Sequence, residues 1–250
     1  ALVVLGGLKR IAEVASYLVP FMGSIYFGAM LIAIVLNINL VIPAFSLIIT
    51  DAFSGTAIAG GTFFGVLIYG VRRGAFSNEA GMGTESLVHG VAKVSNPVKQ
   101  GLVAMTGPIF DTLIICTATA LMILISGVWE TSASQGVTLT AEAFSSLLGS
   151  FGGFVLFACV ICFGLSTIFT YSYYGASCSR FLFGKLGMRF YIYLYIISIF
   201  VYSIVPIDIA INIADGAFAM MAIPTLVSAL WLAPKVMQAS KNYFKIIEGR

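Results

Sequence analysis

A polar stretch inside a long apolar region constrains this chain more than any other feature of its sequence. Apolar residues run from Ala59 to Val71, and the sequence RRGAFSNEAGMGTESLVHGVAK follows directly. A straight helix over residues 59–93 would be about 50 Å long, whereas the hydrocarbon core of a bilayer is about 30 Å thick. The sequence therefore predicts a helix that breaks near residues 78–84 and resumes as a short second helix over residues 85–94.

The overall composition is that of a membrane protein. Of the 250 residues, 60% are hydrophobic and only 9% are charged, whereas a soluble domain carries about 25% charged residues. We predict an all-α, polytopic membrane protein with about six spans, since several apolar runs approach the ~20 residues that cross a bilayer. It forms one transmembrane domain over residues 1–250.

The predicted segments follow from the apolar runs and the basic loops. The chain is apolar from its first residue, and we expect it to begin inside a membrane segment of a longer protein. Residues 1–18 are predicted to be the end of that segment and a short amphipathic helix. The remaining predicted segments are a span over residues 19–42 that ends at Pro43, further spans over 59–233, and a basic tail over 234–250.

The basic residues fall on alternate predicted loops. One side contains nearly all of them: Lys9, Arg10, Lys93, Lys99, Arg180, Lys185, Arg189, Lys235, Lys241, Lys245 and Arg250. The other side contains acidic residues and no Lys or Arg: Asp51, Glu130, Glu142 and Asp208. Cytoplasmic loops retain Lys and Arg, so we predict a multi-pass inner (plasma) membrane protein with a cytoplasmic C-terminus. Arg72 and Arg73 lie outside this pattern, and either line an outer vestibule or snorkel to the interface.

Ionisable residues near the predicted break are candidates for function. Glu79 and Asp111 lie at membrane depth, where an unpaired charge is expensive and a functional role is the default hypothesis. The structural alternative is that each carboxylate pairs with a nearby arginine or caps a helix end. We interpret His89 as a hydrogen-bonding residue, and Asp215 as a cap near the start of the last span.

A cluster of hydroxyl groups lies in a later span. Ser166 and Thr167 are adjacent, and Tyr171 lies one helical turn beyond Thr167 on the same face. Hydroxyl oxygens are hard donors that suit a cation such as sodium, although two of them do not complete a site. The alternative, which spacing alone favours, is that they bond back to carbonyls of their own helix.

Several classes of function are excluded by what the sequence lacks. It has a single histidine and no motif that pairs a nucleophile with a base, so we predict that it is not an enzyme. No basic aromatic patch accompanies the net charge of +3, so we expect no nucleic-acid partner, and we expect no organic cofactor. Cys159 and Cys162 form a C-x-x-C pattern on an apolar helix, which we interpret as packing.

Several segments of the chain strongly resemble the alanine or glycine:cation symporters, a family of sodium-coupled amino-acid transporters. The polar stretch contains SNEAGMG, and NPVKQGLVAMTGPIFDTLIICTATALMIL follows it. STIFTYSYYG at residues 166–175 and IADGAFAMMAIPTL at residues 213–226 resemble later parts of the same family. The resemblance is collinear over essentially the whole chain, and the SNEAG block joined to PVKQGLVAM is specific to the family.

The resemblance implies a leucine-transporter-type fold, in which two five-helix inverted repeats surround a site at the membrane midplane. Residues 19–42 would be the last helix of the first repeat, and residues 59–233 the second repeat. The first, N-terminal repeat would then be a missing partner from the same protein. The implied activity is sodium-coupled symport of a small neutral amino acid such as alanine or glycine, across the lipid bilayer and by alternating access.

The resemblance also assigns site residues by position. Backbone and side-chain groups of Gly81, Met82, Gly83, Thr84, Thr167 and Tyr171 would bind the substrate, and Ser166 and Thr167 would bind Na⁺, the coupling ion. Separately from the resemblance, the residues near the break make Asn78, Glu79, Asp111, Arg72 and Arg73 candidates for supporting or gating the site. The chain departs from the family where members commonly have Gly-Ser-Ala-Pro or Gly-Trp: here Thr84-Glu85-Ser86 and Thr170-Tyr171 occur, which bears on the preferred amino acid.

Two rival functions follow from the same residues. A proton-coupled amino-acid transporter would use Glu79 or Asp111 as the proton carrier. A channel or receptor would use the polar break as a re-entrant gate.

Overall fold

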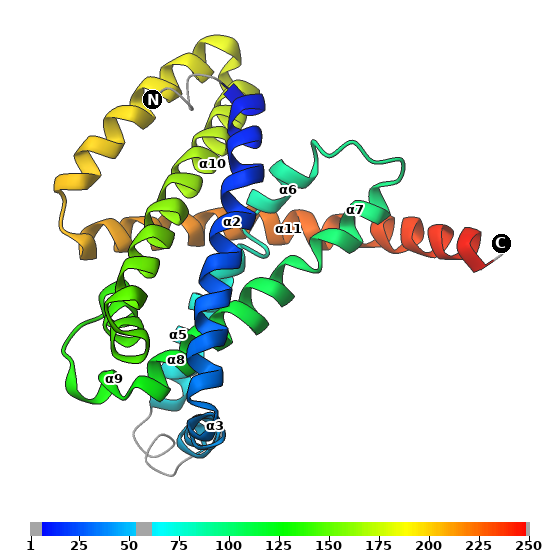
Figure 1. Cartoon of the computed structure of the whole chain (residues 1–250). Helices are drawn as coiled ribbons and strands as arrows, with labels where there is room; N and C mark the ends of the chain where they lie inside the picture. The colour runs from blue at the N-terminus through cyan, green and yellow to red at the C-terminus, as the bar shows by residue number, and fades with distance from the viewer. Residues whose placement is uncertain (1–6, 54–61, 249–250) are drawn as a thin grey trace. The chain divides into compact units, whose positions relative to one another are not determined.

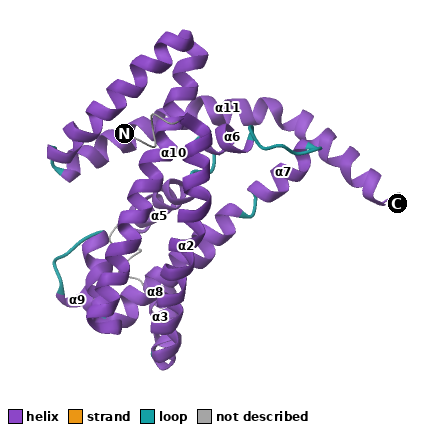
Figure 2. Cartoon of the chain, turned by 45° about the horizontal axis from the view of Figure 1, so that its top comes forward, coloured by secondary structure: helices purple, strands orange, loops and turns teal. Residues whose placement is uncertain are grey.

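The chain forms helices throughout the part that its computed structural model describes, residues 7–53 and 62–248. Helices account for nearly all of these residues (Figures 1 and 2). In chain order the elements are α2 (Gly7–Leu36), α3 (Ile38–Ala52), α5 (Thr62–Asn78), α6 (Thr84–His89), α7 (Pro97–Ala104), η1 (Ile109–Cys116), α8 (Thr117–Ser126), α9 (Val128–Thr131), α10 (Val137–Ile204) and α11 (Ile207–Glu248).

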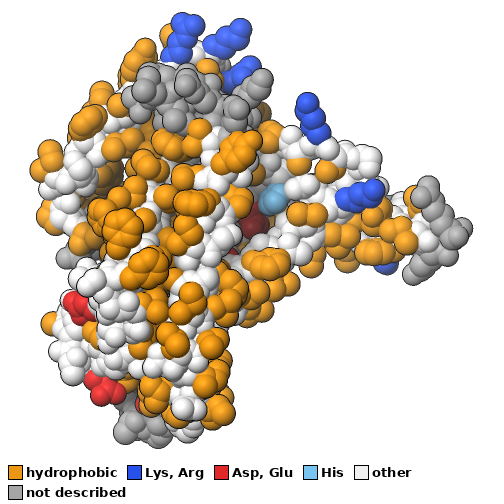
Figure 3. Space-filling view, viewed as in Figure 1, with side chains coloured by type: hydrophobic (Ala, Val, Ile, Leu, Met, Phe, Trp, Pro, Cys, Tyr) orange, Lys and Arg blue, Asp and Glu red, His pale blue; other side chains and the backbone are white. Residues whose placement is uncertain are grey.

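Four of the described helical stretches are long and apolar enough to cross a membrane, which supports the predicted class of protein. They are Ser16–Leu36, Pro97–Ser126, Val137–Ile204 and Ile209–Ile247. Hydrophobic side chains cover much of the molecular surface in view in Figure 3. A soluble protein would bury these groups, whereas lipid tails solvate them.

The chain divides into two compact units. One comprises residues 1–72 and 111–175, and the other comprises residues 73–110 and 176–250. The division falls inside α5 and inside α10, so each of these helices contributes to both units.

The core of the first unit forms where α2 packs with α8 and α10. On α2, Ala29 and Ala33 are one helical turn apart and almost fully buried, and small residues at this spacing allow helices to approach closely in a membrane. The Tyr26 ring stacks on Phe144 at a centroid distance of 5.5 Å, and its hydroxyl lies 2.9 Å from Thr119 Oγ1. The buried cluster consists of Tyr26, Ala29, Met30, Ala33, Ala118, Met122, Phe144, Val155, Leu156 and Cys159. The burial of Cys159 in this core confirms its interpretation as a packing residue.

Helix α10 is too long to be a single membrane crossing. Its 68 residues would extend about 100 Å as a straight helix, about three times the thickness of the hydrocarbon core. Two glycines inside it, Gly149 and Gly184, have left-handed φ angles of 66° and 70°. A left-handed residue interrupts the regular helical path, and the yellow helix in Figure 1 changes direction near residue 184.

The two glycine corners share one local geometry. Three residues after each corner, a second glycine approaches the segment that precedes the corner. A Cβ atom on Gly152 would lie 2.8 Å from Leu148 Cβ and closer still to the Phe144 carbonyl oxygen. A Cβ atom on Gly187 would collide with Phe183 Cβ and lie 3.2 Å from the Ser179 carbonyl oxygen. In each corner, the second glycine therefore lies close to the residues that are one and five positions before the left-handed glycine.

The N-terminal helices differ in their bounds from the predicted segments. Helix α2 is continuous from Gly7 to Leu36, so the predicted amphipathic helix is not a separate element. The first break falls at Asn37, not at Pro43. The Asn37 side-chain amide donates a hydrogen bond to the Ala33 carbonyl (2.9 Å), which competes with backbone bonding. Helix α3 then continues through Pro43 to Ala52. The predicted end of an earlier span at residues 1–6, and the predicted start at residue 59, lie outside the described residues.

We predict that Gly187→Ala lowers the thermal stability of the purified protein in detergent. The added methyl group has to displace Phe183 or the backbone of Ser179, and over-packing of this kind costs about 1–3 kcal/mol. The matched control is Gly164→Ala in the same helix, because no atom lies within 4 Å of its added Cβ. The control should match the wild-type melting temperature or exceed it, since alanine favours helix over glycine. Equal melting temperatures for the two variants would contradict the corner geometry.

Candidate functional site

The predicted break in the helix is present, and it lies between α5 and α6. Helix α5 ends at Asn78 and α6 begins at Thr84, so the break is confirmed, although α6 is shorter than the predicted second helix. Three residues in the break have left-handed backbone angles: Glu79 (φ 54°), Gly81 (φ 81°) and Gly83 (φ 89°). Among the described residues Glu79 is the only non-glycine with a positive φ. A residue with a side chain in this region costs about 1–2 kcal/mol, so the surroundings must hold it there.

Local hydrogen bonds hold the backbone of the break. The Asn78 side-chain oxygen accepts a bond from the Ala80 amide (3.0 Å), and the Met82 amide donates to the Glu79 carbonyl (3.1 Å). The Ser86 hydroxyl donates to the Gly83 carbonyl (2.6 Å). These bonds replace part of the helical hydrogen bonding that the break removes. Backbone polar groups inside a membrane require such partners, because no water is present to bond them.

Helix α11 packs against the same break within the second unit. The Thr225 hydroxyl lies 2.5 Å from the Gly81 carbonyl oxygen, and 2.9 and 3.0 Å from the carbonyl oxygens of Met221 and Ala222 in its own helix. A Cβ atom on Gly83 would collide with the Thr225 methyl group. The analysis of the sequence did not identify Thr225. The available signal was its position directly after Pro224 in an apolar helix, where proline provides no backbone N–H.

Two residues that follow the glycines are almost fully buried. Met82 is 6% exposed and Thr84 is 1% exposed. Within the described part of the chain, no group forms a hydrogen bond with the Thr84 hydroxyl oxygen. Leaving a buried polar atom without a partner costs about 1–3 kcal/mol. Among the described residues, the hydrogen-bonding capacity of the buried Thr84 hydroxyl is therefore unused.

Asp111 lies in a helix of unusual type. The segment Ile109–Cys116 is a π-helix, and Asp111 is its third residue. The Thr112 hydroxyl donates to the Asp111 carboxylate (3.2 Å), and the Thr117 hydroxyl to the Thr112 carbonyl (3.5 Å). The apolar pattern predicted a regular span here and did not indicate the π-helix. Such segments are rare and occur frequently at functional sites, which keeps Asp111 among the candidates.

The predicted sodium ligands lie on α10, in the first unit. Ser166 is buried, and its hydroxyl donates a hydrogen bond to the Phe163 carbonyl (2.9 Å). This bond to a carbonyl of its own helix is the structural alternative that the sequence analysis gave for this residue. The oxygen keeps lone pairs that can accept a cation. Thr167 is exposed, and the half-buried Tyr171 contacts the Tyr174 ring at 5.3 Å. Residues 81–84 belong to the second unit, so the predicted substrate residues divide between the two units.

The remaining predicted residues have defined surroundings. His89 Nδ1 lies 2.7 Å from the Gln100 amide nitrogen, which confirms that it is a hydrogen-bonding residue and joins α6 to α7. Arg72 and Arg73 are exposed on α5. The interpretation of Asp215 as a cap is wrong. It is 8% exposed and lies more than two turns inside α11, which begins at Ile207.

Comparison with known proteins identifies the family of this chain. The family model described as the sodium:alanine symporter family matches residues 1–249. The chain belongs to that family. It is therefore a member of a transporter family and not an enzyme.

Relatives in bacteria and archaea are about one-third identical. The sodium/alanine symporter AgcS of Methanococcus maripaludis is 36% identical over 249 residues, which is 98% of this chain and 55% of the relative. The probable sodium/glutamine symporter GlnT of Bacillus subtilis is 34% identical over 242 residues, 96% of this chain and 51% of the relative. The putative sodium/proton-dependent alanine carrier protein YrbD, also of Bacillus subtilis, is 33% identical over 262 residues, which is 96% of this chain and 53% of the relative. The chain thus spans about half the length of the curated relatives it matches.

We predict that Gly83→Ala destabilises this member of the family more than an alanine substitution at a glycine in a regular, uncrowded part of a helix. The new side chain meets the left-handed backbone penalty of about 1–2 kcal/mol and also collides with the Thr225 methyl group. Thermal unfolding of the purified protein measures the loss. The double variant Gly83→Ala with Thr225→Ser removes that methyl group, and should recover part of the loss and leave the backbone penalty. No recovery would show that the two residues do not pack as described.

Proposed function

We propose that this chain is part of a symporter that couples sodium entry to the uptake of a small neutral amino acid by alternating access. The observation that carries the proposal is the break between α5 and α6, with its left-handed glycines and the buried Thr84 hydroxyl that has no partner among the described residues. Membership of the sodium:alanine symporter family supports the same function. A structural kink needs the glycines but gains nothing from an unsatisfied hydroxyl.

We assign the substrate to the break and to the two residues of α10 that the resemblance indicates. The backbone of Gly81 and Gly83 and the side chains of Met82 and Thr84 would contact the amino acid, together with Thr167 and Tyr171. Glycine backbone lets a ligand approach peptide groups that side chains elsewhere would cover. Asn78 supports this arrangement through its bond to the Ala80 amide, and we assign Glu79, Arg72 and Arg73 to support or gating.

We assign the sodium ion to Ser166 and Thr167, with further oxygen ligands required to complete its coordination. Coupling requires that sodium bind the substrate-competent state more tightly than the alternative state, because equal affinity for both shifts nothing. Ordering of the hydroxyl pair by sodium would provide that difference.

We infer the membrane topology from the charge distribution and the helix lengths. About six spans, the second half of a five-plus-five inverted repeat, and a cytoplasmic C-terminus agree with the alternation of basic loops. The corner at Gly184 lies within the basic segment between Arg180 and Arg189, where a loop between two spans was predicted. The first repeat would come from the remainder of a longer protein.

A proton-coupled mechanism is the second candidate. One relative is named a sodium/proton-dependent alanine carrier protein, and Asp111 lies in a π-helix. In this mechanism Asp111 or Glu79 would carry the proton. The two mechanisms differ in the gradient that drives uptake.

Uptake into proteoliposomes by the complete protein tests the proposal. Radiolabelled alanine, glycine, serine and glutamine would be supplied with external sodium or potassium, with and without an imposed pH gradient. Uptake that requires sodium supports the symporter. Uptake driven by the pH gradient in potassium would transfer the mechanism to Glu79 and Asp111. Flux far above transporter turnover would indicate a channel.

We predict that Thr84→Val separates stability from transport. Valine has nearly the same shape and removes the hydroxyl that lacks a partner, so the melting temperature should rise or stay unchanged. Uptake at low substrate concentration should fall about ten-fold, because the substrate loses a hydrogen bond to a charged group. Higher stability with unchanged uptake would assign Thr84 to packing alone.

We predict that Thr167→Ala raises the half-saturating concentrations of both sodium and the amino acid. We take the contribution of one oxygen ligand to equal that of a hydrogen bond to a charged group, about 1.5–3 kcal/mol, so the sodium value should rise about ten-fold or more. Thr170→Ala is the matched control, since the Thr170 hydroxyl donates to the Ser166 carbonyl of its own helix (2.9 Å). Unchanged half-saturating concentrations in Thr167→Ala would contradict the proposal that Thr167 binds sodium and substrate.

A further inference from the structure

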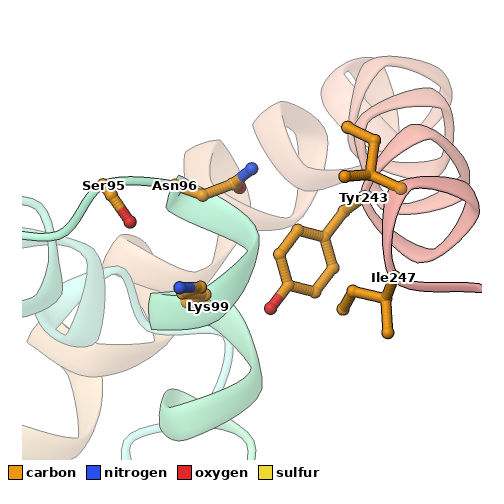
Figure 4. Close-up of a pocket in the computed structure, with 6 residues that line it drawn as sticks. Ser95, Asn96, Lys99, Tyr243 and Ile247 are labelled. Carbon is orange, nitrogen blue, oxygen red and sulfur yellow. The ribbon is translucent and has the colours of Figure 1, made fainter. Parts of the chain in front are cut away.

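A cleft in the second unit lies away from the residues of the proposed transport site. It has a volume of about 310 Å³ and forms between the start of α7 and the end of α11 (Figure 4). Its lining residues are Ser95, Asn96, Lys99, Tyr243, Ile246 and Ile247. In Figure 4 the Tyr243 ring extends from α11 toward the first turn of α7, where Lys99 lies.

The polar side of the cleft contains several hydrogen-bond donors. The Lys99 ammonium group has three donors and no acceptor, and the hydroxyls of Tyr243 and Ser95 can donate as well. None of the six lining residues is acidic. Asn96 caps α7 by accepting a bond from the Val98 amide (2.9 Å), so the positive end of the α7 dipole lies at the same place. This chemistry favours an anion.

The cleft lies at the ends of two helical stretches that are long and apolar enough to cross a membrane. The apolar stretch Pro97–Ser126 begins at the cleft, and the stretch Ile209–Ile247 finishes at it. Ends of spanning helices lie at the level of the lipid headgroups, where tyrosine and lysine side chains are enriched. The anions present at this depth are the phosphate groups of phospholipids.

The last part of α11, after Pro234, has two distinct faces. At 100° per residue, the lysines, Gln238 and Asn242 lie together on one side of the helix, and most of the apolar residues lie on the other side, with Ser240 among them. The polar side contains Lys235, Gln238, Lys241, Asn242 and Lys245, and the apolar side contains Val236, Tyr243, Phe244, Ile246 and Ile247. Val236, Ile246 and Ile247 are 64%, 63% and 50% exposed. A helix with an exposed apolar face and a basic polar face is typical of a segment that lies in the interface of an anionic membrane.

We propose that this cleft binds the phosphate of an anionic phospholipid, while residues 235–247 lie in the membrane interface. Lys99 pairs with the phosphate, and the Tyr243 hydroxyl donates a hydrogen bond to it. Ile246 and Ile247 contact the glycerol and the first carbons of the acyl chains. Lys241 and Lys245, on the opposite face, contribute general attraction to the anionic surface. The site does not depend on which amino acid or ion the protein transports.

Native mass spectrometry of the purified complete protein tests the site. Phosphatidylglycerol and phosphatidylcholine with identical acyl chains would be titrated, and the bound fractions compared. Phosphatidylglycerol should bind more tightly. Lys99→Gln should weaken its binding about five-fold, the effect of one lysine near an anionic surface. Tyr243→Phe should weaken it less, since it removes one neutral donor, and Lys99→Arg should retain tight binding.

The matched control is Lys241→Gln, which removes the same charge from α11 outside the cleft. It should leave the affinity for phosphatidylglycerol within two-fold of the wild-type value, because dissolved salt screens the exposed Lys241 charge from a lipid in the cleft. Equal binding of the two lipids, equal loss in Lys241→Gln and Lys99→Gln, or displacement of the lipid by inorganic phosphate at an equal concentration would each overturn the proposal. Retention volume on size exclusion confirms that each variant is folded, and the Lys99→Arg result distinguishes loss of charge from loss of structure.

Discussion

The absence of water in the bilayer core is the constraint on which this structure depends. Each backbone polar group there needs a partner within the protein, and a regular helix provides one at every residue. The segment between Asn78 and Thr84 gives up part of that pattern, and local bonds from Asn78 and Ser86 and a bond from α11 replace it. An irregular backbone inside a membrane is stable only where other contacts hold it. Here Thr225 provides those contacts, because it bonds to the Gly81 carbonyl and packs against Gly83.

Much of the polar break could be predicted from the sequence, because a straight helix over residues 59–93 would be longer than a bilayer is thick, and the polar stretch within it contains glycines. The hydrogen-bonding role of His89 was also predictable, since a single histidine without other metal ligands favours that role. Residues that act at a distance were not. Thr225 lies 144 positions from its partner Gly81, and its one local signal, the position directly after Pro224, does not indicate which residue it contacts.

The helix boundaries show the same division between local and distant causes. A proline at residue 43 suggested the end of a span, but Asn37 ends the helix by bonding to its own backbone, and α3 continues through the proline. The basic segment between Arg180 and Arg189 indicated an interruption near the corner at Gly184, but the apolar pattern gave no sign of the corner at Gly149 or of the π-helix around Asp111. Both depend on backbone angles that one or two residues determine, and hydrophobic periodicity does not record them.

The Thr225 hydroxyl has a mechanical consequence for the break. It has one proton and three carbonyl oxygens within reach, those of Gly81, Met221 and Ala222. If α11 shifts away from the break, the proton turns to a carbonyl of its own helix, and the number of bonds that the hydroxyl donates stays constant. The connection therefore behaves as a latch: it holds the two segments in register when closed, and opening it leaves only the Gly81 carbonyl in need of a new donor.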